Sequence, residues 1–95
     1  MTLGQKIKEL REFHNILQRD LADRLNISDT FLSKVENNQK GLQRGHLKTL
    51  SSIFKYPLSE FEMLWIASKI LHLIKNEEEG IKALKFVIKL EEKKS

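Results

Sequence analysis

Apolar residues recur along the chain at intervals of three and four, the spacing that places them on one face of a helix. Polar corners divide this pattern into six segments. The first four segments carry Leu3, Ile7, Leu10 and Phe13, with His14 extending the stripe; Leu21, Ala22 and Leu25; Leu32 and Val35; and Leu47, Leu50, Ile53 and Phe54. Four short helices are therefore predicted within the first 56 residues, which leaves little room for a strand.

Asparagine, glycine and proline mark the ends of these helices. Asn15 is expected to close the first helix in the left-handed conformation, which asparagine tolerates better than most residues. Residues 37–45, NNQKGLQRG, show no periodicity and are predicted to form a loop. Tyr56-Pro57 is expected to end the fourth helix, because a residue before proline is disfavoured in the helical region.

The second and third helices meet at a short polar corner, Asn26-Ile27-Ser28. Ser28 is a good N-cap for the third helix, and Asp29 suits the positive end of its dipole. Two helices joined by so short a turn must cross steeply, as in a helix-turn-helix. The outer face of the third helix is entirely polar and consists of Asp29, Thr30, Ser33, Lys34 and Asn37. Side chains of these types can read the edges of DNA bases.

The remaining residues also follow a helical pattern. A fifth helix is predicted from Leu58 to about Asn76 and a sixth over residues 81–90, with the acidic stretch Glu77–Glu79 before it. A surface helix needs one apolar stripe, whereas the fifth segment has apolar residues on more than one face. This indicates a second packing partner for that helix. Residues 91–95 are expected to fray.

Length, cysteine content and charge narrow the class of protein. The 95 residues suit one compact domain, or one small domain with an appendage. The absence of cysteine excludes disulfides and thiolate metal sites, and it suits a reducing compartment. Residues 1–56 carry ten Lys/Arg against six Asp/Glu, while residues 57–95 carry seven of each. The excess of positive charge in residues 1–56 either binds a nucleic acid backbone or is an ordinary scatter of surface charge.

Other classes of protein find little support in the residues. The charged N-terminus lacks the apolar region of a signal peptide, and uncharged runs such as Met63–Ser68 span at most six residues, far shorter than a membrane span of roughly 20 residues. The three histidines have no partners at metal-ligand spacing, and no nucleophile elbow or phosphate-binding glycine loop occurs. We therefore expect a soluble, cytoplasmic, non-enzymatic protein that needs no metal or cofactor.

About ten positions hold residue types in a common register: Gln18, Leu21-Ala22, Leu25, Ile27-Ser28, Leu32-Ser33, Val35-Glu36, Leu47, Leu50 and Phe54. Together they resemble the Cro/repressor-type helix-turn-helix family, often called XRE, over roughly residues 3–58. The resemblance implies an all-α, five-helix DNA-binding fold, usually dimeric. Its third helix would enter the major groove of an operator.

The register also suggests roles for single residues. The residues expected at base edges are Asp29, Thr30, Ser33 and Lys34, and those expected at phosphates are Gln18, Ser28, Asn37, Lys40 and Arg44. Arg11 and Glu36 match a pair that in some phage repressors forms a buried ion pair between the first and third helices. The resemblance therefore gives these two residues a structural role.

Simpler interpretations stay open for three residues of the third helix. Lys34 contacts a base, a phosphate or only water. Asp29 either accepts a hydrogen bond from cytosine or only complements the helix dipole. Phe31 either touches a thymine methyl group or packs at the edge of the corner, and packing is the simpler expectation.

The chain departs from the family pattern at two positions in the loop after the third helix. Asn38 stands where the family usually has glycine, and Leu42 stands where a proline usually follows. Asparagine accepts the left-handed geometry that glycine would supply, so the loop is expected to keep its shape. The expected roles of Lys40 and Arg44 depend on the path of this loop.

The sequence thus predicts a double-stranded DNA-binding transcriptional regulator, a dimeric repressor or autoregulator. Residues 1–57 are expected to form the helix-turn-helix domain, and residues 58–95 a C-terminal helical dimerisation region. The expected dimer interface consists of Leu64, Trp65, Ile70, Leu73, Ile74, Leu84, Val87 and Ile88. The alternative is an antitoxin or another interaction module, whose C-terminal helices bind a toxin or another regulator.

Overall fold

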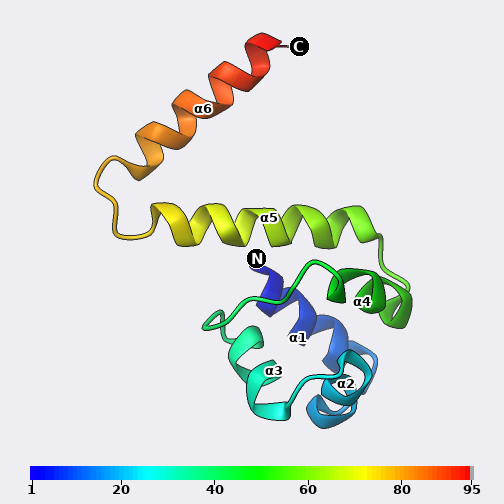
Figure 1. Cartoon of the computed structure of the whole chain (residues 1–95). Coiled ribbons are helices and arrows are strands. Elements are labelled where there is room, and N and C mark those ends of the chain that lie inside the picture. Colours follow the sequence, from blue (N-terminus) through cyan, green and yellow to red (C-terminus); the bar gives the residue numbers. More distant parts are fainter. Residues whose placement is uncertain (95) are drawn as a thin grey trace.

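The computed structural model describes residues 1–94, and these residues form six α-helices and no strand (Figure 1). The helices are α1 (Leu3–Phe13), α2 (Gln18–Leu25), α3 (Asp29–Glu36), α4 (His46–Phe54), α5 (Leu58–Ile74) and α6 (Gly80–Lys94). The predicted all-α fold is confirmed. In Figure 1, α1 to α4 form a group on one side of α5, and α6 projects away from the far end of α5.

The ends of the helices follow local hydrogen-bonding rules. Thr2 and Gln5 form a capping box at the start of α1, in which each side chain accepts a hydrogen bond from the backbone N–H of the other. Asn15 and Asn26 adopt the left-handed conformation, with φ of 55° and 58°. Their positions confirm the predicted end of the first helix and the polar corner after the second.

Two predicted helix ends were wrong. α4 ends at Phe54 with Lys55 in the left-handed conformation, φ 51°, so the helix stops before Tyr56-Pro57 is reached. α6 continues through residues 91–94, where fraying was expected. The (i, i+3) pair between Glu91 and Lys94, at 3.3 Å, fits a continuing last turn. Ser95 lies outside the described residues.

The hydrophobic core lies between α1 to α4 and the first half of α5. The buried apolar residues are Leu3, Ile7, Leu10, Leu21, Ala22, Leu25, Leu32, Val35, Leu42, Leu47, Leu50, Phe54 and Phe61. Phe61 belongs to α5 and is fully buried. The division of the chain after residue 57 stays a prediction, and this core reaches across it.

Phe13 does not face the core, contrary to the sequence pattern. Its side chain is 79% exposed, and α1 ends at this residue. The ring meets His14 edge-on, and His14 in turn lies against buried Phe54 with ring centroids 5.4 Å apart. The inward stripe of α1 therefore ends at Leu10, and the histidine lies at the edge of the core.

Gly4 lets the first turn of α1 approach the end of α3. A Cβ atom at this position would lie 2.2 Å from the carbonyl oxygen of Val35 and 2.9 Å from that of Glu36. Both obstacles are backbone atoms, so a side chain could be accommodated only by moving one helix against the other. The absence of a side chain at Gly4 thus sets the distance between these two helices.

A second glycine shapes the corner between α5 and α6. A Cβ atom on Gly80 would lie 2.8 Å from the carbonyl oxygen of Ile74. The turn also contains Asn76 in the left-handed conformation, φ 67°, and hydrogen bonds from the Glu77 N–H to Ile74 O and from the Gly80 N–H to Glu77 O. The direction in which α6 leaves α5 is therefore defined by a closed turn.

Among residues 1–94, none of the helices combines the length and the apolar character that crossing a membrane requires.

Candidate nucleic-acid interface

The outer face of α3 is available to a partner. Asp29, Thr30 and Lys34 are exposed and Ser33 is half-buried, while Leu32 and Val35 on the opposite face belong to the core. The four polar residues therefore share one accessible face of an eight-residue helix. Their contact with DNA bases stays a prediction.

Side chains fix both ends of α3. The Ser28 hydroxyl accepts a hydrogen bond from the Phe31 N–H at 3.0 Å, as an N-cap should. At the other end, the side-chain amide of Asn37 donates to the carbonyl of Ser33 at 2.9 Å. Phe31 is half-buried and packs against the core, in agreement with the simpler expectation for this residue. Phosphate contacts by Ser28 and Asn37 stay predictions.

An ion pair joins α1 to the back of α3. The Arg11 Nε donates to Glu36 Oε2 at 2.8 Å, and Arg11 Nη2 donates to Glu36 Oε1 at 3.1 Å. The remaining guanidinium nitrogen, Nη1, donates to the carbonyl of Ile16 at 3.0 Å. Such a forked pair fixes the orientation of both side chains. The structure contains the pair that the resemblance implied.

The charge on Arg11 is stabilised by this partner. The hydrogen bond to Glu36 raises the pKa of Arg11 above its ordinary value, and partial burial opposes the rise. A raised pKa of a basic group contributes stability at every pH below its unfolded value, and the contribution is lost only as the pH rises through the folded value. The pair therefore keeps its charged arginine throughout the physiological pH range.

Gln18 takes part in the same network. Its side-chain amide Nε2 donates to Glu36 Oε1 at 3.1 Å, so three N–H groups from two residues point at one carboxylate. Glu36 is a charged side chain that is 3% exposed, and these donors replace the water it has lost. Gln18 thus helps to hold α3, and its phosphate contact stays a prediction.

The loop after α3 contains the two departures from the family pattern, and both residues have a defined place in it. Asn38 adopts φ 64°, the geometry expected of it, and Leu42 is buried in the core. Lys40 is exposed. Arg44 turns towards α5, where it pairs with Glu62 at 3.2 Å and lies 5.4 Å from the centre of the Trp65 ring. The phosphate contacts proposed for Lys40 and Arg44 stay predictions.

The residues proposed for a dimer interface fall into two groups. Leu64 and Trp65 pack against the core of their own chain, and the Trp65 Nε1 donates to the carbonyl of Leu42 at 2.7 Å. Both are thus engaged within the protomer. The others lie beyond this contact on α5 and α6: Ile74 and Leu84 are half-buried, and Ile70, Leu73, Val87 and Ile88 are exposed.

Three contacts that hold α3 and the loop after it were not predicted from the sequence: the close approach at Gly4 and the hydrogen bonds of Trp65 and Arg11 to backbone carbonyls. Gly4 interrupts a helical pattern near its start, and a glycine in that setting signals a close approach. The hydrogen bond of Trp65 to Leu42 and that of Arg11 to Ile16 join residues whose register is set only by tertiary packing. No sequence signal could have indicated them.

Residues 1–94 contain no group of three histidine, cysteine or acidic side chains that could hold a metal ion.

Comparison with protein families places residues 4–65 in the family described as a helix-turn-helix domain. Comparisons with curated proteins and with solved structures found no match. The matched residues cover α1 from Gly4 onward, α2 to α4, the first half of α5, the Arg11–Glu36 pair and the exposed face of α3. The chain belongs to the helix-turn-helix domain family of DNA-binding regulators, of the Cro/repressor type.

Proposed function

We propose that this protein is a dimeric transcriptional repressor or autoregulator that reads a specific double-stranded operator. The observation that carries the proposal is the exposed polar face of α3, held from behind by Arg11, Gln18 and Glu36. A recognition helix must be fixed in orientation, because hydrogen bonds to base edges depend on geometry. Asp29, Thr30, Ser33 and Lys34 are proposed to contact bases. Residues at both ends of α3 are proposed to contact phosphates.

A dimer supplies what one recognition helix lacks. A single α3 offers four candidate residues for base contacts, which is few for one operator. Two copies related by a two-fold axis read half-sites about 34–36 Å apart, one turn of DNA. The apolar residues left exposed on α5 and α6 support this assembly, because Leu73 is 75% and Phe86 60% exposed. We propose that such residues meet a second copy.

Selection of bound sites from random double-stranded DNA tests the proposal. The selected sites should share a palindrome whose half-sites are centred one helical turn apart. A single non-palindromic site would contradict the dimeric arrangement. Failure to enrich any sequence would contradict sequence-specific recognition.

Replacing Lys34 with glutamine tests the recognition face. Loss of one base contact is expected to weaken binding to the selected site by about 1–3 kcal/mol, and loss of a phosphate contact instead lowers the log–log salt slope by about 0.9. Fluorescence anisotropy with labelled duplex over a salt series measures both quantities.

The control for this change is Lys85→Gln, which removes the same charge from an exposed position of α6, distant from α3 in Figure 1. It should leave both the affinity and the slope near those of the unchanged protein. Equal effects of Lys34→Gln and Lys85→Gln would mean that only total charge matters, and they would contradict a role for Lys34 in recognition.

A second candidate function is supported by the same apolar surface. An antitoxin or another interaction module would use α5 and α6 to bind a toxin or another regulator, with DNA binding secondary or absent. Binding to random duplex at low salt separates the two functions. A DNA-binding regulator binds there and loses affinity steeply as salt rises, whereas a pure interaction module binds hardly at all.

A further inference from the structure

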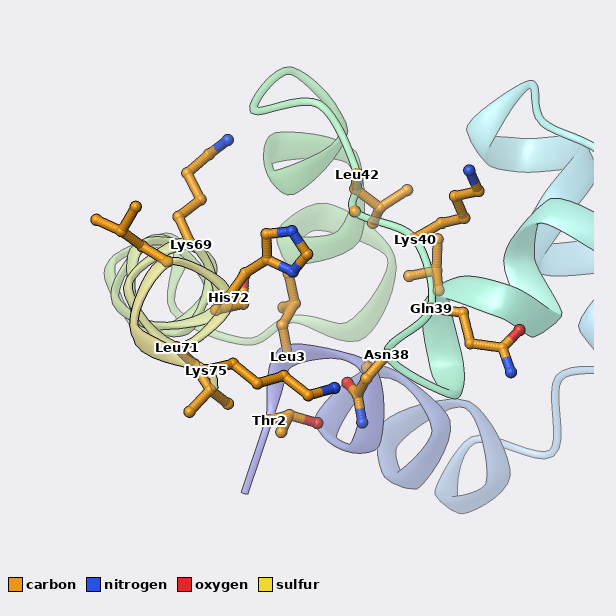
Figure 2. Close-up of a pocket in the computed structure, with 15 residues that line it drawn as sticks. Thr2, Leu3, Asn38, Gln39, Lys40, Leu42, Lys69, Leu71, His72 and Lys75 are labelled. Atoms are coloured by element: carbon orange, nitrogen blue, oxygen red, sulfur yellow. The ribbon is translucent and has the colours of Figure 1, made fainter. Parts of the chain in front are cut away.

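A groove of about 690 Å³ runs between the second half of α5, the start of α1 and the loop after α3 (Figure 2). Its inner wall is apolar and includes Leu3, Val35 and Leu42 from the core. Leu71 and Leu73, both exposed, belong to the α5 side. In size and apolar character the groove resembles surfaces that receive a partner.

The groove carries positive charge. Lys40, Lys69 and Lys75 line it, and none of its fifteen lining residues is acidic. Within residues 1–94 these three lysines form no ion pair, although Lys69 lies 4.4 Å from the centre of the Trp65 ring. Figure 2 shows the Lys75 side chain extending across the groove towards Thr2 and Asn38. A complementary occupant would be acidic and partly apolar.

The chain presents such a segment at the corner between α5 and α6. Glu77, Glu78 and Glu79 are consecutive and exposed, and the closed turn around Asn76 holds them in place. Of the three, only Glu79 has an ion-pair partner in the described part of the chain: Lys82, at 4.0 Å and mostly exposed. Exposed apolar residues flank the corner, including Leu73 on α5 and Ile81 on α6.

The acidic corner and the basic groove lie close together at the same end of α5. A two-fold axis near that end would bring the corner of each copy to the groove of the other, because such an axis makes contacts reciprocal. The dimer would then contain two identical contacts, each pairing the acidic corner of one copy with the lysines of the other. The apolar residues beside each corner would be buried between the copies.

We propose that the groove receives the Glu77–Glu79 corner of a second copy, so that this corner and the lysine-lined groove form the core of the dimer interface. The proposal rests on the dimer proposed above and names its contact surface. Because residues 38–42 line the groove directly after α3, docking would also hold the loop that carries Lys40. Dimerisation would thereby fix part of the surface proposed to contact phosphates.

Charge reversal tests the pairing. One variant carries Glu77→Lys, Glu78→Lys and Glu79→Lys, and the other carries Lys69→Glu and Lys75→Glu. A dimer of either variant alone would place like charges against each other at both contacts: lysines in the first variant and glutamates in the second. Each variant alone should therefore dimerise about tenfold or more weakly. In an equimolar mixture both contacts become complementary, so a mixed dimer should form. Sedimentation equilibrium at fixed ionic strength measures the dissociation constants, and circular dichroism verifies folding.

The matched control is Lys48→Glu with Lys55→Glu, the same charge change on exposed positions of α4 and its C-terminal end, outside the groove and on neither α5 nor α6. It should leave the dimer intact. The docking would be overturned if the reversal variants dimerise like the unchanged protein, or if they fail to form a mixed dimer. Either result would leave the proposal of a dimeric DNA-binding protein in place. An unchanged chain that stays monomeric while bound to its operator would overturn the dimer itself.

Cross-linking gives an independent measurement, since the chain has no cysteine. Glu78→Cys on one copy and Gln39→Cys on another should form a disulfide-linked mixed dimer under mild oxidation, because Gln39 lines the groove. The mixed link should form faster than links within either variant alone. Equal rates for all pairings would contradict the proposed contact.

Discussion

Glu36 shows how one buried charge can organise a surface that lies some distance from it. Its carboxylate receives two hydrogen bonds from Arg11 and one from Gln18, so residues from α1 and α2 meet at the end of α3. A buried carboxylate without such donors would be strongly unfavourable. The hydrogen bonds to Glu36 therefore fix the orientation of α3. Because the exposed polar residues belong to the same helix, their orientation is fixed as well.

Replacing Glu36 with glutamine tests this link. The amide keeps the shape of the carboxylate, but it replaces one of the two acceptor oxygens with an NH2 group that faces a donor, and it leaves Arg11 without its counter-charge. We expect the free energy of unfolding to fall by about 2–4 kcal/mol, measured by urea denaturation.

The matched control is Glu9→Gln, which breaks the surface pair between exposed Glu9 and half-buried Lys6 at 2.9 Å. An exposed pair contributes at most about 1 kcal/mol, so this variant should unfold nearly like the unchanged protein. Similar losses in the two variants would show that burial of Glu36 has no special importance.

At the scale of the helices, sequence patterns predicted the elements well and their ends less well. Asn15 and Asn38 could be assigned to left-handed positions because asparagine tolerates that geometry. Lys55 could not, since a lysine gives no such signal, and the end of α4 was therefore placed too late. The extension of α6 was missed because residues 91–94 are charged and lack an apolar pattern.

Lys55 offers a test of this local strain. The residue caps α4 with φ 51° and is exposed, so Lys55→Gly should relieve strain without removing a buried contact. We expect the free energy of unfolding to rise by about 0.5–1 kcal/mol, seen as a higher melting temperature.

Lys48→Gly, an exposed change inside the same helix, should have the opposite effect and lower the stability by about 1 kcal/mol. A loss of stability in both variants would argue against strain at Lys55.

At the scale of the whole molecule, the sequence predicted the packing of α1 to α4 better than the packing around α5. The core and the face of α3 followed from periodicity, and the Arg11–Glu36 pair followed from the family resemblance. The inward packing of Trp65 and the groove beside α5 did not, because each depends on how segments distant in sequence pack together. A second apolar face on α5 was predicted, and Ile66, Ile70, Leu71 and Leu73 remain exposed there.

Because α6 is joined to α5 through the corner at Gly80, a small rotation at this corner moves the far end of α6 by a larger distance. Fifteen residues of helix extend about 22 Å, so a rotation of about 10° at the corner displaces the far end by about 4 Å. Where the exposed apolar residues of α6 meet the second copy in the proposed dimer, such a displacement would change the separation of the two recognition helices while leaving each one intact. Gly80→Ala, which crowds Ile74, should therefore alter the half-site spacing of selected DNA sites but not the half-site sequence. Unchanged spacing would show that the angle at this corner has no influence on operator geometry.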